Sequence, residues 1–400
     1  MANGRRHLLH DLRGLSRLAI EATTNVTDVV QAMHHTIAAG PAVLGSPLAG
    51  PVELLIAPVY ASIRGITRLV GSGIDAALAQ AAELVDEHAP PAEQEVALAV
   101  LNGVVGDHLA ASGNPLAIEM CLRRNAVPLV LERDALAAAL PDATSKVVVF
   151  IHGSCMSDRQ WKREGHDHSA ALARDLGVTV LHLLYNSGLH ISENGRSLDR
   201  LLERLAREWP LPLEELSLVG HSMGGLVARS ACHAAEASGA AWRSLLRRLV
   251  CIGSPHQGTL LEQGGNLLGV LLGVSRYSAP IGRLARLRSA GVTDLRYGNV
   301  LDEHWAGRDR FAAHGDVRRS LSLPAGVDSY LVAGTLSSQA SAVLRGDGLV
   351  SVDSALGIHP LPALTLAVPE AHRFIAYGEG HVSLLSSESV YGALRGWFAA

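Results

Sequence analysis

The chain has 400 residues, of which 48% are hydrophobic and 18% charged, with 40 glycines and a formal net charge of −4. This composition excludes a disordered chain and is typical of a globular α/β protein. Arginines are scattered and no basic stretch is interleaved with aromatic residues, so the sequence predicts no nucleic-acid partner.

The cysteines and the apolar stretches indicate the compartment. The four cysteines are far apart and form no C-x-x-C pair, so we expect buried free thiols at Cys121, Cys155, Cys232 and Cys251. The N-terminus alternates charged and apolar residues, which predicts no signal peptide. Prolines interrupt the most apolar stretch, residues 43–63, so we expect no span of the roughly 30 Å hydrocarbon core. A cytoplasmic protein is therefore expected.

Residues 1–112 are predicted to form an N-terminal helical extension. Apolar residues recur three or four positions apart at 8–19 and at 96–109, with breaks near Gly40-Pro41 and Pro90-Pro91. Asn102-Gly103 and Gly106 argue against the last of these helices. Such an extension either packs on the catalytic domain, which the low basic charge favours, or contacts a membrane surface or a partner.

Residues 113–400 alternate predicted strands with predicted helices. Short strands are expected at 117–122 and at 127–131, the second at a sheet edge because it contains Pro128. The alternation predicts an α/β fold with a mainly parallel sheet flanked by helices. The further strands are expected at 146–151, 178–184, 216–220, 246–252, 328–333 and 373–377, and helices at 168–176 with Asp167 as N-cap, 194–209 and 387–398.

The stretch 216–237 contains Gly220-His221-Ser222-Met223-Gly224 between an apolar strand and a helix. This G-x-S-x-G pattern is typical of a nucleophile elbow, in which a sharp turn exposes a serine hydroxyl above the sheet. The residues two before and two after the serine must be small, as Gly220 and Gly224 are. Ser222 is the predicted nucleophile.

A nucleophilic serine needs a base, and the base needs a carboxylate that fixes its tautomer. With an elbow of this kind the chain order is serine, acid, histidine. Asp347, between two glycines after a late strand, is the predicted acid, with Asp353 as its rival. His381, in the loop after the last strand, is the predicted base, and His372 is the lesser candidate because it precedes that strand.

The corner at His152-Gly153-Ser154 follows a buried strand. Enzymes with a nucleophile elbow place the second donor of the oxyanion hole in such a loop. The backbone N–H groups of Ser154 and Met223 are the predicted donors, and His152 is expected to brace the loop. His166, Asp167 and His168 lack the further ligands that a zinc site needs. We expect no metal and no cofactor.

Residues 256–322 interrupt the alternation with about 65 residues, far more than the roughly 2 to 6 of most connections in such folds. They contain the apolar run at 267–272 together with glycines and arginines. This composition predicts a cap insertion, which either covers an apolar acyl pocket or is a packed helical insertion.

The stretches VVVFIHG, LVGHSMGG, IGSPHQGT, GDGLVS and EGHVSLL occur in this order and resemble the α/β-hydrolase superfamily, near its bacterial lipases and inositol-deacylase-like esterases. The resemblance runs from residue 116 to the end. It implies an α/β-hydrolase fold with Ser222, Asp347 and His381 as catalytic triad and Ser154 and Met223 as oxyanion-hole donors. It also implies that residues 254–258 border the cap. Unlike secreted lipases of that group, this chain shows no signal peptide and no evident calcium site.

These features predict a serine hydrolase acting on a small-molecule ester or lipid, with short-to-medium acyl chains preferred. An acyltransferase or lipase with the same triad remains an alternative, as does a non-enzymatic scaffold that binds through its N-terminal helices. Peripheral membrane contact through those helices is left open, and the sequence predicts no oligomeric state.

Overall fold

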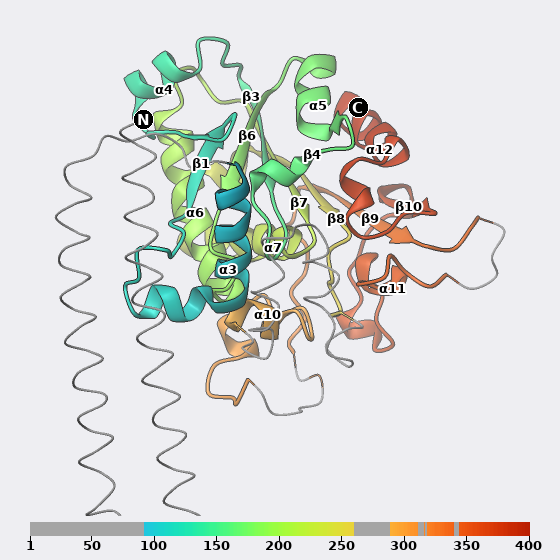
Figure 1. The fold of residues 1–400 in the computed structure, drawn as a ribbon. Helices are drawn as coiled ribbons and strands as arrows, with labels where there is room; N and C mark the ends of the chain where they lie inside the picture. Colours follow the sequence, from blue (N-terminus) through green and yellow to red (C-terminus); the bar gives the residue numbers. More distant parts are fainter. Residues whose placement is uncertain (1–91, 260–288, 311–315, 317, 340–343) are drawn as a thin grey trace, which may run out of the picture. The chain divides into compact units, whose positions relative to one another are not determined.

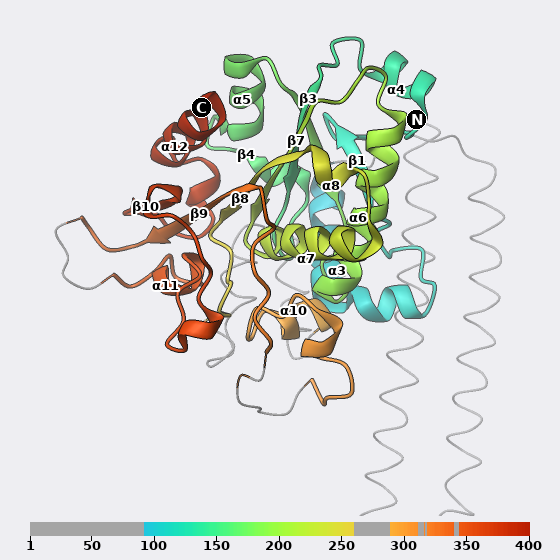
Figure 2. The same ribbon diagram turned by 180° about the vertical axis from the view of Figure 1, so that it is seen from behind.

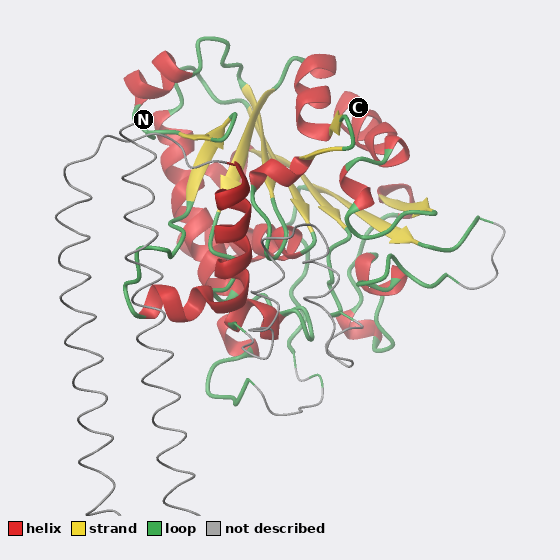
Figure 3. Cartoon of the chain, viewed as in Figure 1, coloured by secondary structure: helices red, strands yellow, loops and turns green. Residues whose placement is uncertain are grey.

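The computed structural model describes residues 92–259, 289–310, 316, 318–339 and 344–400. Residues 92–108 and 118–400 form one compact unit, and residues 109–117 fall in the other. The first unit contains an eight-stranded sheet, which is yellow in Figure 3, with helices on both faces. No helix among the described residues is long and apolar enough to cross a bilayer.

The sheet has the strand order β10-β9-β8-β7-β3-β6-β1-β2 (Figure 1). Six neighbouring strands of this order run parallel, namely β10, β9, β8, β7, β3 and β6. Strand β1 pairs antiparallel with β6 and with β2. The predicted α/β architecture with a mainly parallel sheet is thus confirmed. The strands are β1 Cys121–Arg124, β2 Val127–Pro128, β3 Lys146–Ile151, β6 Thr179–Leu184, β7 Glu215–His221, β8 Leu246–Ile252, β9 Asp328–Thr335 and β10 Arg373–Tyr377, with β4 Lys162–Arg163 and β5 His166–Asp167 in a separate hairpin.

The central strand β3 determines where a site can form. Its neighbours are β6 on one side and β7 on the other, so the strand order reverses at β3. In open parallel sheets, ligands bind at the carboxyl ends of the strands beside such a reversal. The loops that follow β3 and β7, which carry Ser154 and Ser222, meet at this point.

The helices form two layers, seen from opposite sides in Figures 1 and 2. Val147, Val149 and Ile151 of β3 pack in the core with α6 and α7, while Val148 and Phe150 pack in the core with α5 and α12. This alternation follows from the two-residue period of a strand that is buried on both faces. The helices are α3 Ala92–Ala111, α4 Arg133–Ala139, α5 His168–Leu176, α6 Ile191–Glu208, α7 Met223–Ser238, α8 Trp242–Leu245, α10 Ala290–Asp294, α11 Val352–Ala355 and α12 Glu388–Ala399.

Two helix starts show how local chemistry sets the boundaries. Asp167 caps α5 as predicted, because its Oδ1 accepts the N–H groups of Ser169 at 2.9 Å and Ala170 at 3.1 Å. Helix α6 begins three residues before the predicted Asn194. Glu193 accepts the His190 backbone N–H at 3.1 Å and closes a capping box that the sequence pattern alone did not reveal.

Helix α3 forms despite the glycines that argued against it. A Cβ at Gly103 would lie 2.3 Å from Cys155 Sγ, and one at Gly106 would lie 1.9 Å from Asn186 Oδ1. The glycines therefore allow the helix to lie directly against the loops that follow β3 and β6, and the backbone bends at Val105 (φ −135°, ψ 18°).

Buried ion pairs fix the start of α3. Glu95 pairs with Arg123 of β1 and with Arg159, and Arg123 also pairs with Asp158 at 2.7 Å. Residues 92–108, which the sequence places in the extension 1–112, thus lie in the same compact unit as the sheet. Residues 1–91 lie outside the described residues.

Candidate active site

Ser222 stands in the turn between β7 and α7 with a positive φ of 53° and a ψ of −123°. Its N–H donates to Ile252 O at 2.8 Å. A Cβ at Gly220 would lie 2.4 Å from Gly225 N, and one at Gly224 would lie 2.3 Å from Ile151 O. Both positions thus require glycine, and the strained serine backbone is the geometry that a nucleophile elbow predicts.

Asp347 and His381 lie together at the carboxyl end of the sheet, after β9 and β10. His381 Nδ1 is 2.7 Å from Asp347 Oδ2, and both residues are 3% exposed. The other carboxylate oxygen, Oδ1, accepts the N–H groups of Leu349 at 2.9 Å and Val350 at 2.8 Å. Burial alone raises the pKa of Asp347, but the charge and hydrogen bond of His381 and the two N–H groups outweigh it and hold that pKa below its usual value. Asp347 is therefore an ionised orienting group for His381.

The imidazole of His381 lies near the elbow, because its ring is 4.8 Å from that of His221. A Cβ at Gly253, the residue after the Ser222 partner Ile252, would lie 3.4 Å from His381 Cε1. His381 Nε2 is buried and makes no hydrogen bond, so the structure joins Asp347 to His381 but leaves the bond from His381 to Ser222 unmade. Catalytic hydrogen bonds are often long in unliganded enzymes and tighten in the substrate complex.

His221, next to Ser222 in the chain, also contacts His381. Its ring lies 4.8 Å from the His381 ring, and its Nε2 lies 3.0 Å from His381 O. Burial, with His381 next to it, lowers the pKa of His221 to about 3, so the ring is neutral. The G-x-S-x-G pattern fixes no residue type at this position, so His221 was not predicted as a site residue, although its place directly before the elbow serine was a signal for it.

The loop after β3 carries the predicted donor Ser154, which is fully buried. A Cβ at Gly153 would lie 3.0 Å from Ser222 Cβ, so this loop lies against Ser222. Ser154 N–H donates to none of the described residues. Met223 is the first residue of α7, where a backbone N–H has no acceptor within the helix. The predicted donor Met223 thus directly follows Ser222, and the predicted donor Ser154 belongs to a loop that lies against Ser222.

Residues after β6 hold that loop in shape. Cys155 has a φ of 59°, and its N–H donates to Ser187 Oγ at 3.0 Å. Tyr185 Oη donates to His152 O at 2.9 Å, and the two rings stack 4.3 Å apart. His152 therefore braces the loop, as expected, and burial lowers its pKa to about 4. No local sequence pattern links Tyr185 and Ser187 to the loop after β3, so neither residue was predicted.

The rival candidates lie elsewhere. Asp353 is exposed in the first turn of α11. His372 Nδ1 lies 3.1 Å from Ser329 O, near the start of β9 and hence at the opposite edge of the sheet from Asp347. His166 and His168 contact each other at 2.8 Å, and within the described chain no three His, Cys, Asp or Glu side chains are grouped to hold a metal.

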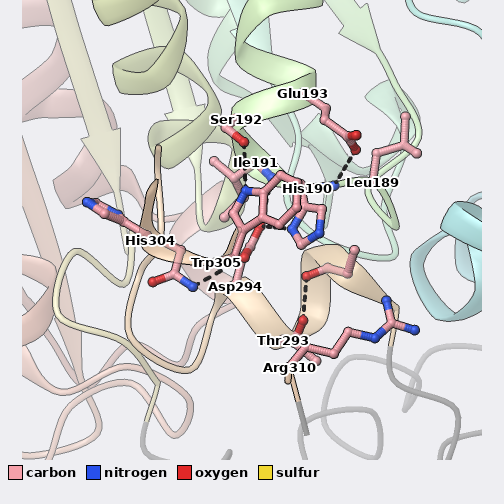
Figure 4. Close-up of polar contacts among 12 residues, drawn as sticks. Leu189, His190, Ile191, Ser192, Glu193, Thr293, Asp294, His304, Trp305 and Arg310 are labelled. Atoms are coloured by element: carbon pink, nitrogen blue, oxygen red, sulfur yellow. Dashed lines mark hydrogen bonds and ion pairs between the residues drawn. The ribbon is translucent and has the colours of Figure 1, made fainter. Parts of the chain in front are cut away.

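The described part of the predicted cap is fastened to α6 (Figure 4). Asp294 Oδ2 accepts the Ile191 N–H at 2.9 Å and lies 3.0 Å from His190 Nδ1, whose ring stacks on Trp305 at 3.6 Å. Trp305 Nε1 donates to Ser192 Oγ at 3.0 Å. Residues 289–305 are thus anchored, while the apolar run at 267–272 lies outside the described residues.

Residues 142–309 match the family model of the PGAP1-like alpha/beta domain, a stretch that contains Ser154 and Ser222 and ends before Asp347. No curated protein matches the chain. Among solved structures, the chain is similar to a mature lipase from Bacillus licheniformis (16% identity, TM-score 0.41, covering 63% of this chain and 91% of that one). It is also similar to a lipase from Staphylococcus hyicus (13%, 0.35, 64% and 94%) and an esterase from Pyrococcus furiosus (15%, 0.39, 64% and 81%). Similarity this low says nothing of what this chain acts on.

Proposed function

We propose that this chain, an α/β-hydrolase with a PGAP1-like domain, hydrolyses carboxylic esters through an acyl-enzyme on Ser222. The observation that carries the proposal is the buried Asp347–His381 pair, whose Oδ2 and Nδ1 are 2.7 Å apart, together with the strained backbone of Ser222 at φ 53°. A carboxylate, an imidazole and an activated hydroxyl in this order are the parts that acyl transfer requires.

In the proposed reaction, His381 Nε2 takes the Ser222 proton while Ser222 Oγ attacks the ester carbonyl. Asp347 keeps the other proton on His381 Nδ1 and stabilises the imidazolium that forms. The oxyanion accepts hydrogen bonds from the N–H groups of Ser154 and Met223 at the N-terminus of α7, where the helix dipole also favours negative charge. His381 then protonates the leaving alcohol. A water, deprotonated by His381, next attacks the acyl-enzyme, and His381 returns the proton to Ser222 Oγ as the acid is released.

We propose short-to-medium acyl chains as preferred substrates. A crevice beside Gly153 and His221 is lined by the apolar Met156, Trp161 and Leu385 and by the polar Ser157 and Gln160, and it has no room for a water-sized sphere. Contacts with apolar side chains distinguish substrates by only about 1 to 3 kcal/mol per methylene. The preference should therefore be broad, with activity falling as the acyl chain lengthens.

The test compares the wild-type chain with Ser222→Ala. A fluorophosphonate should label the wild type and not the variant, and the variant should lose on the order of 10⁶-fold in kcat on p-nitrophenyl esters with an almost unchanged Tm. Retained turnover in the variant would refute the assignment of Ser222. Across esters from acetate to palmitate, a kcat/KM maximum at palmitate would indicate a lipase. Labelling without turnover of any ester would point to an amide, a thioester or acyl transfer.

A further inference from the structure

One hydrogen bond joins the end of β7 to the loop that carries His381. His221 is the last residue of β7 and directly precedes Ser222, and its Nε2 lies 3.0 Å from His381 O. Among the residues that the structure describes, no other hydrogen bond joins β7 or Ser222 to the loop at 378–385. The bond of His221 is therefore the direct polar link between the elbow and this loop.

His221 is the donor of this bond. A carbonyl oxygen only accepts, so Nε2 of His221 carries the proton. The side chain is fully buried, and this burial, with His381 next to it, lowers the pKa of His221 to about 3. The ring is therefore neutral around pH 7. A neutral donor can hold His381 without adding a like charge that would oppose the imidazolium formed in the proposed reaction.

Packing fixes the orientation of the His221 ring. Its centroid lies 4.8 Å from that of the His381 ring and 6.3 Å from that of Trp161, whose plane stands at 78° to it. A Cβ at Gly153 would lie 3.2 Å from His221 Nδ1, so the glycine leaves room for the ring. The donor at Nε2 is thus held by its neighbours, as precise positioning requires.

The backbone of His381 is held from two directions. Its N–H donates to Asp347 O at 3.0 Å, and its carbonyl oxygen accepts from His221. The first bond fixes His381 relative to Asp347, as does the 2.7 Å contact between their side chains. The second bond fixes His381 relative to the strand that ends at Ser222. Each of the two bonds thus connects His381 to a different member of the proposed triad.

We propose that His221 is a positioning residue, which sets the distance between His381 and Ser222 through its bond to His381 O. This role rests on the proposed function, because it acts on the transfer of the Ser222 proton to His381. A misplacement of about 1 Å in an active site can lower a rate roughly 10²-fold. Loss of the bond should displace His381 without unfolding its loop, since His168 Nε2 holds the far end, 2.9 Å from Leu384 O.

The test compares two amides at position 221 in the full chain. The amide nitrogen of glutamine is as many bonds from Cα as Nε2 of histidine, whereas that of asparagine is one bond closer. His221→Gln should therefore still donate to His381 O, and His221→Asn should not reach it. The end point of fluorophosphonate labelling counts the active sites, and kcat is expressed per labelled site.

The expected result is a loss in rate that the longer amide restores. His221→Asn should label completely but on the order of 10²-fold more slowly, and its kcat should fall by a similar factor with KM nearly unchanged. His221→Gln should recover most of both rates. A merely structural role would lower Tm and the number of labelled sites and would leave kcat per labelled site unchanged.

His372→Leu is the matched control, because the His372 ring also binds a backbone carbonyl, Ser329 O at 3.1 Å, at the opposite edge of the sheet. This variant should lower Tm and keep kcat per labelled site. If the wild type labels and His221→Asn labels at the same rate, the positioning role is refuted while the proposed function stands. Equal losses in His221→Asn and His221→Gln would also refute it.

A wild-type chain that does not label would refute the proposed function, and the role of His221 with it. If the variants at position 221 fail to fold, the ring ¹⁵N resonances of His221 in the wild type decide the question. A proton on Nε2 supports the bond to His381 O, and a proton on Nδ1 overturns it.

Discussion

Replacing Asp347 by Asn tests the triad most directly, because the hydrogen bonds around the carboxylate dictate how the amide must lie. Asp347 Oδ1 accepts two backbone N–H groups, from Leu349 and Val350. Only the amide oxygen of Asn can accept those bonds, so its NH₂ must face His381 Nδ1. His381 then has to accept at Nδ1 and carries its proton on Nε2, the nitrogen that should receive the Ser222 proton.

The size of the effect follows from this forced tautomer. The same exchange in a serine-protease triad lowers kcat about 10⁴-fold, or roughly 5 kcal/mol of transition-state stabilisation. We expect a loss of this order for Asp347→Asn, with little change in KM. The exposed Asp353 has no comparable bonds to the base, so Asp353→Asn should stay within about threefold of the wild type.

The assay is ester hydrolysis together with the rate of fluorophosphonate labelling, since both require deprotonation of Ser222. Urea unfolding of each variant shows whether the fold persists. If Asp347→Asn keeps more than a tenth of the wild-type activity, the substituted amide does not force the proton of His381 onto Nε2. If Asp353→Asn is the crippled variant, the role of the acid belongs to Asp353.

Three further predictions concern the surroundings of the site. Ser187→Ala removes the acceptor of the Cys155 N–H and should lower kcat more than it changes KM. The loss in kcat should be smaller than the roughly 10²–10³-fold loss caused by removing an oxyanion donor itself. An equal loss of kcat in Ser244→Ala, at an exposed serine, would contradict the role of Ser187. Gly103→Ala should lower both Tm and the rate of labelling, because its Cβ would lie 2.3 Å from Cys155 Sγ. Gly396→Ala in α12, whose Cβ would have nothing within 4 Å, should instead raise stability by about 0.5 to 1 kcal/mol. A lower Tm for Gly396→Ala than for Gly103→Ala would refute the close approach of α3 to Cys155. Burial holds the pKa of five histidines at about 3 or 4 in the folded chain, against 6.5 as their ordinary value, so the unfolded chain binds more protons below pH 6.5. The contribution of these histidines to the free energy of unfolding is therefore fully present above pH 6.5 and is lost towards pH 4, by up to about 1.4 kcal/mol per pH unit for each histidine. The five residues are His152, His168, His182, His221 and His304. An equal free energy of urea unfolding at pH 7 and at pH 5 would rule this out.

The sequence predicted those features that depend on residues close together in the chain. The run 146–151 is buried on both faces and coincides with β3, and the edge position of Pro128 follows from its missing N–H. The order of motifs also named Asp347 and His381, which the structure brings to 2.7 Å. Each of these predictions needed only the strand period, a cap or a loop after a strand.

The contacts that shape the site are tertiary, and the sequence could not predict them. Cys155 N–H finds its acceptor 32 residues away in Ser187, and Glu95 pairs with Arg123 across 28 residues. Nothing near these residues signals such partners. The same limit explains Gly103, which was interpreted as a helix breaker because the sequence does not show that another backbone lies against it.

Deleting the N-terminal residues in two steps tests where the catalytic unit begins. The sequence places a boundary at 112, yet residues 92–108 lie in the unit of the sheet. Removing residues 1–91 leaves every contact described above in place, so the remaining chain should label with fluorophosphonate. Removing residues 1–112 also takes Glu95 from the buried Arg123, which keeps Asp158 as a partner, so the cost is at most about 3–5 kcal/mol, that of a fully broken buried pair. It further removes buried apolar side chains such as Leu101 and Val104, each worth roughly 1.5–3 kcal/mol.

Together these losses are comparable to the roughly 5–15 kcal/mol that stabilise a typical domain. The longer deletion should therefore be insoluble or fail to label, even though it retains Ser222, Asp347 and His381. Glu95→Gln in the full chain separates the two contributions, because it breaks the ion pair and keeps α3. We expect this variant to fold with a lowered Tm and to label more slowly, since Arg123 also binds Asp158 at 2.7 Å, in the turn that follows the loop of Ser154. Full labelling and an unchanged Tm after removal of residues 1–112 would show that α3 contributes nothing to the site, and that the boundary at 112 is the right one.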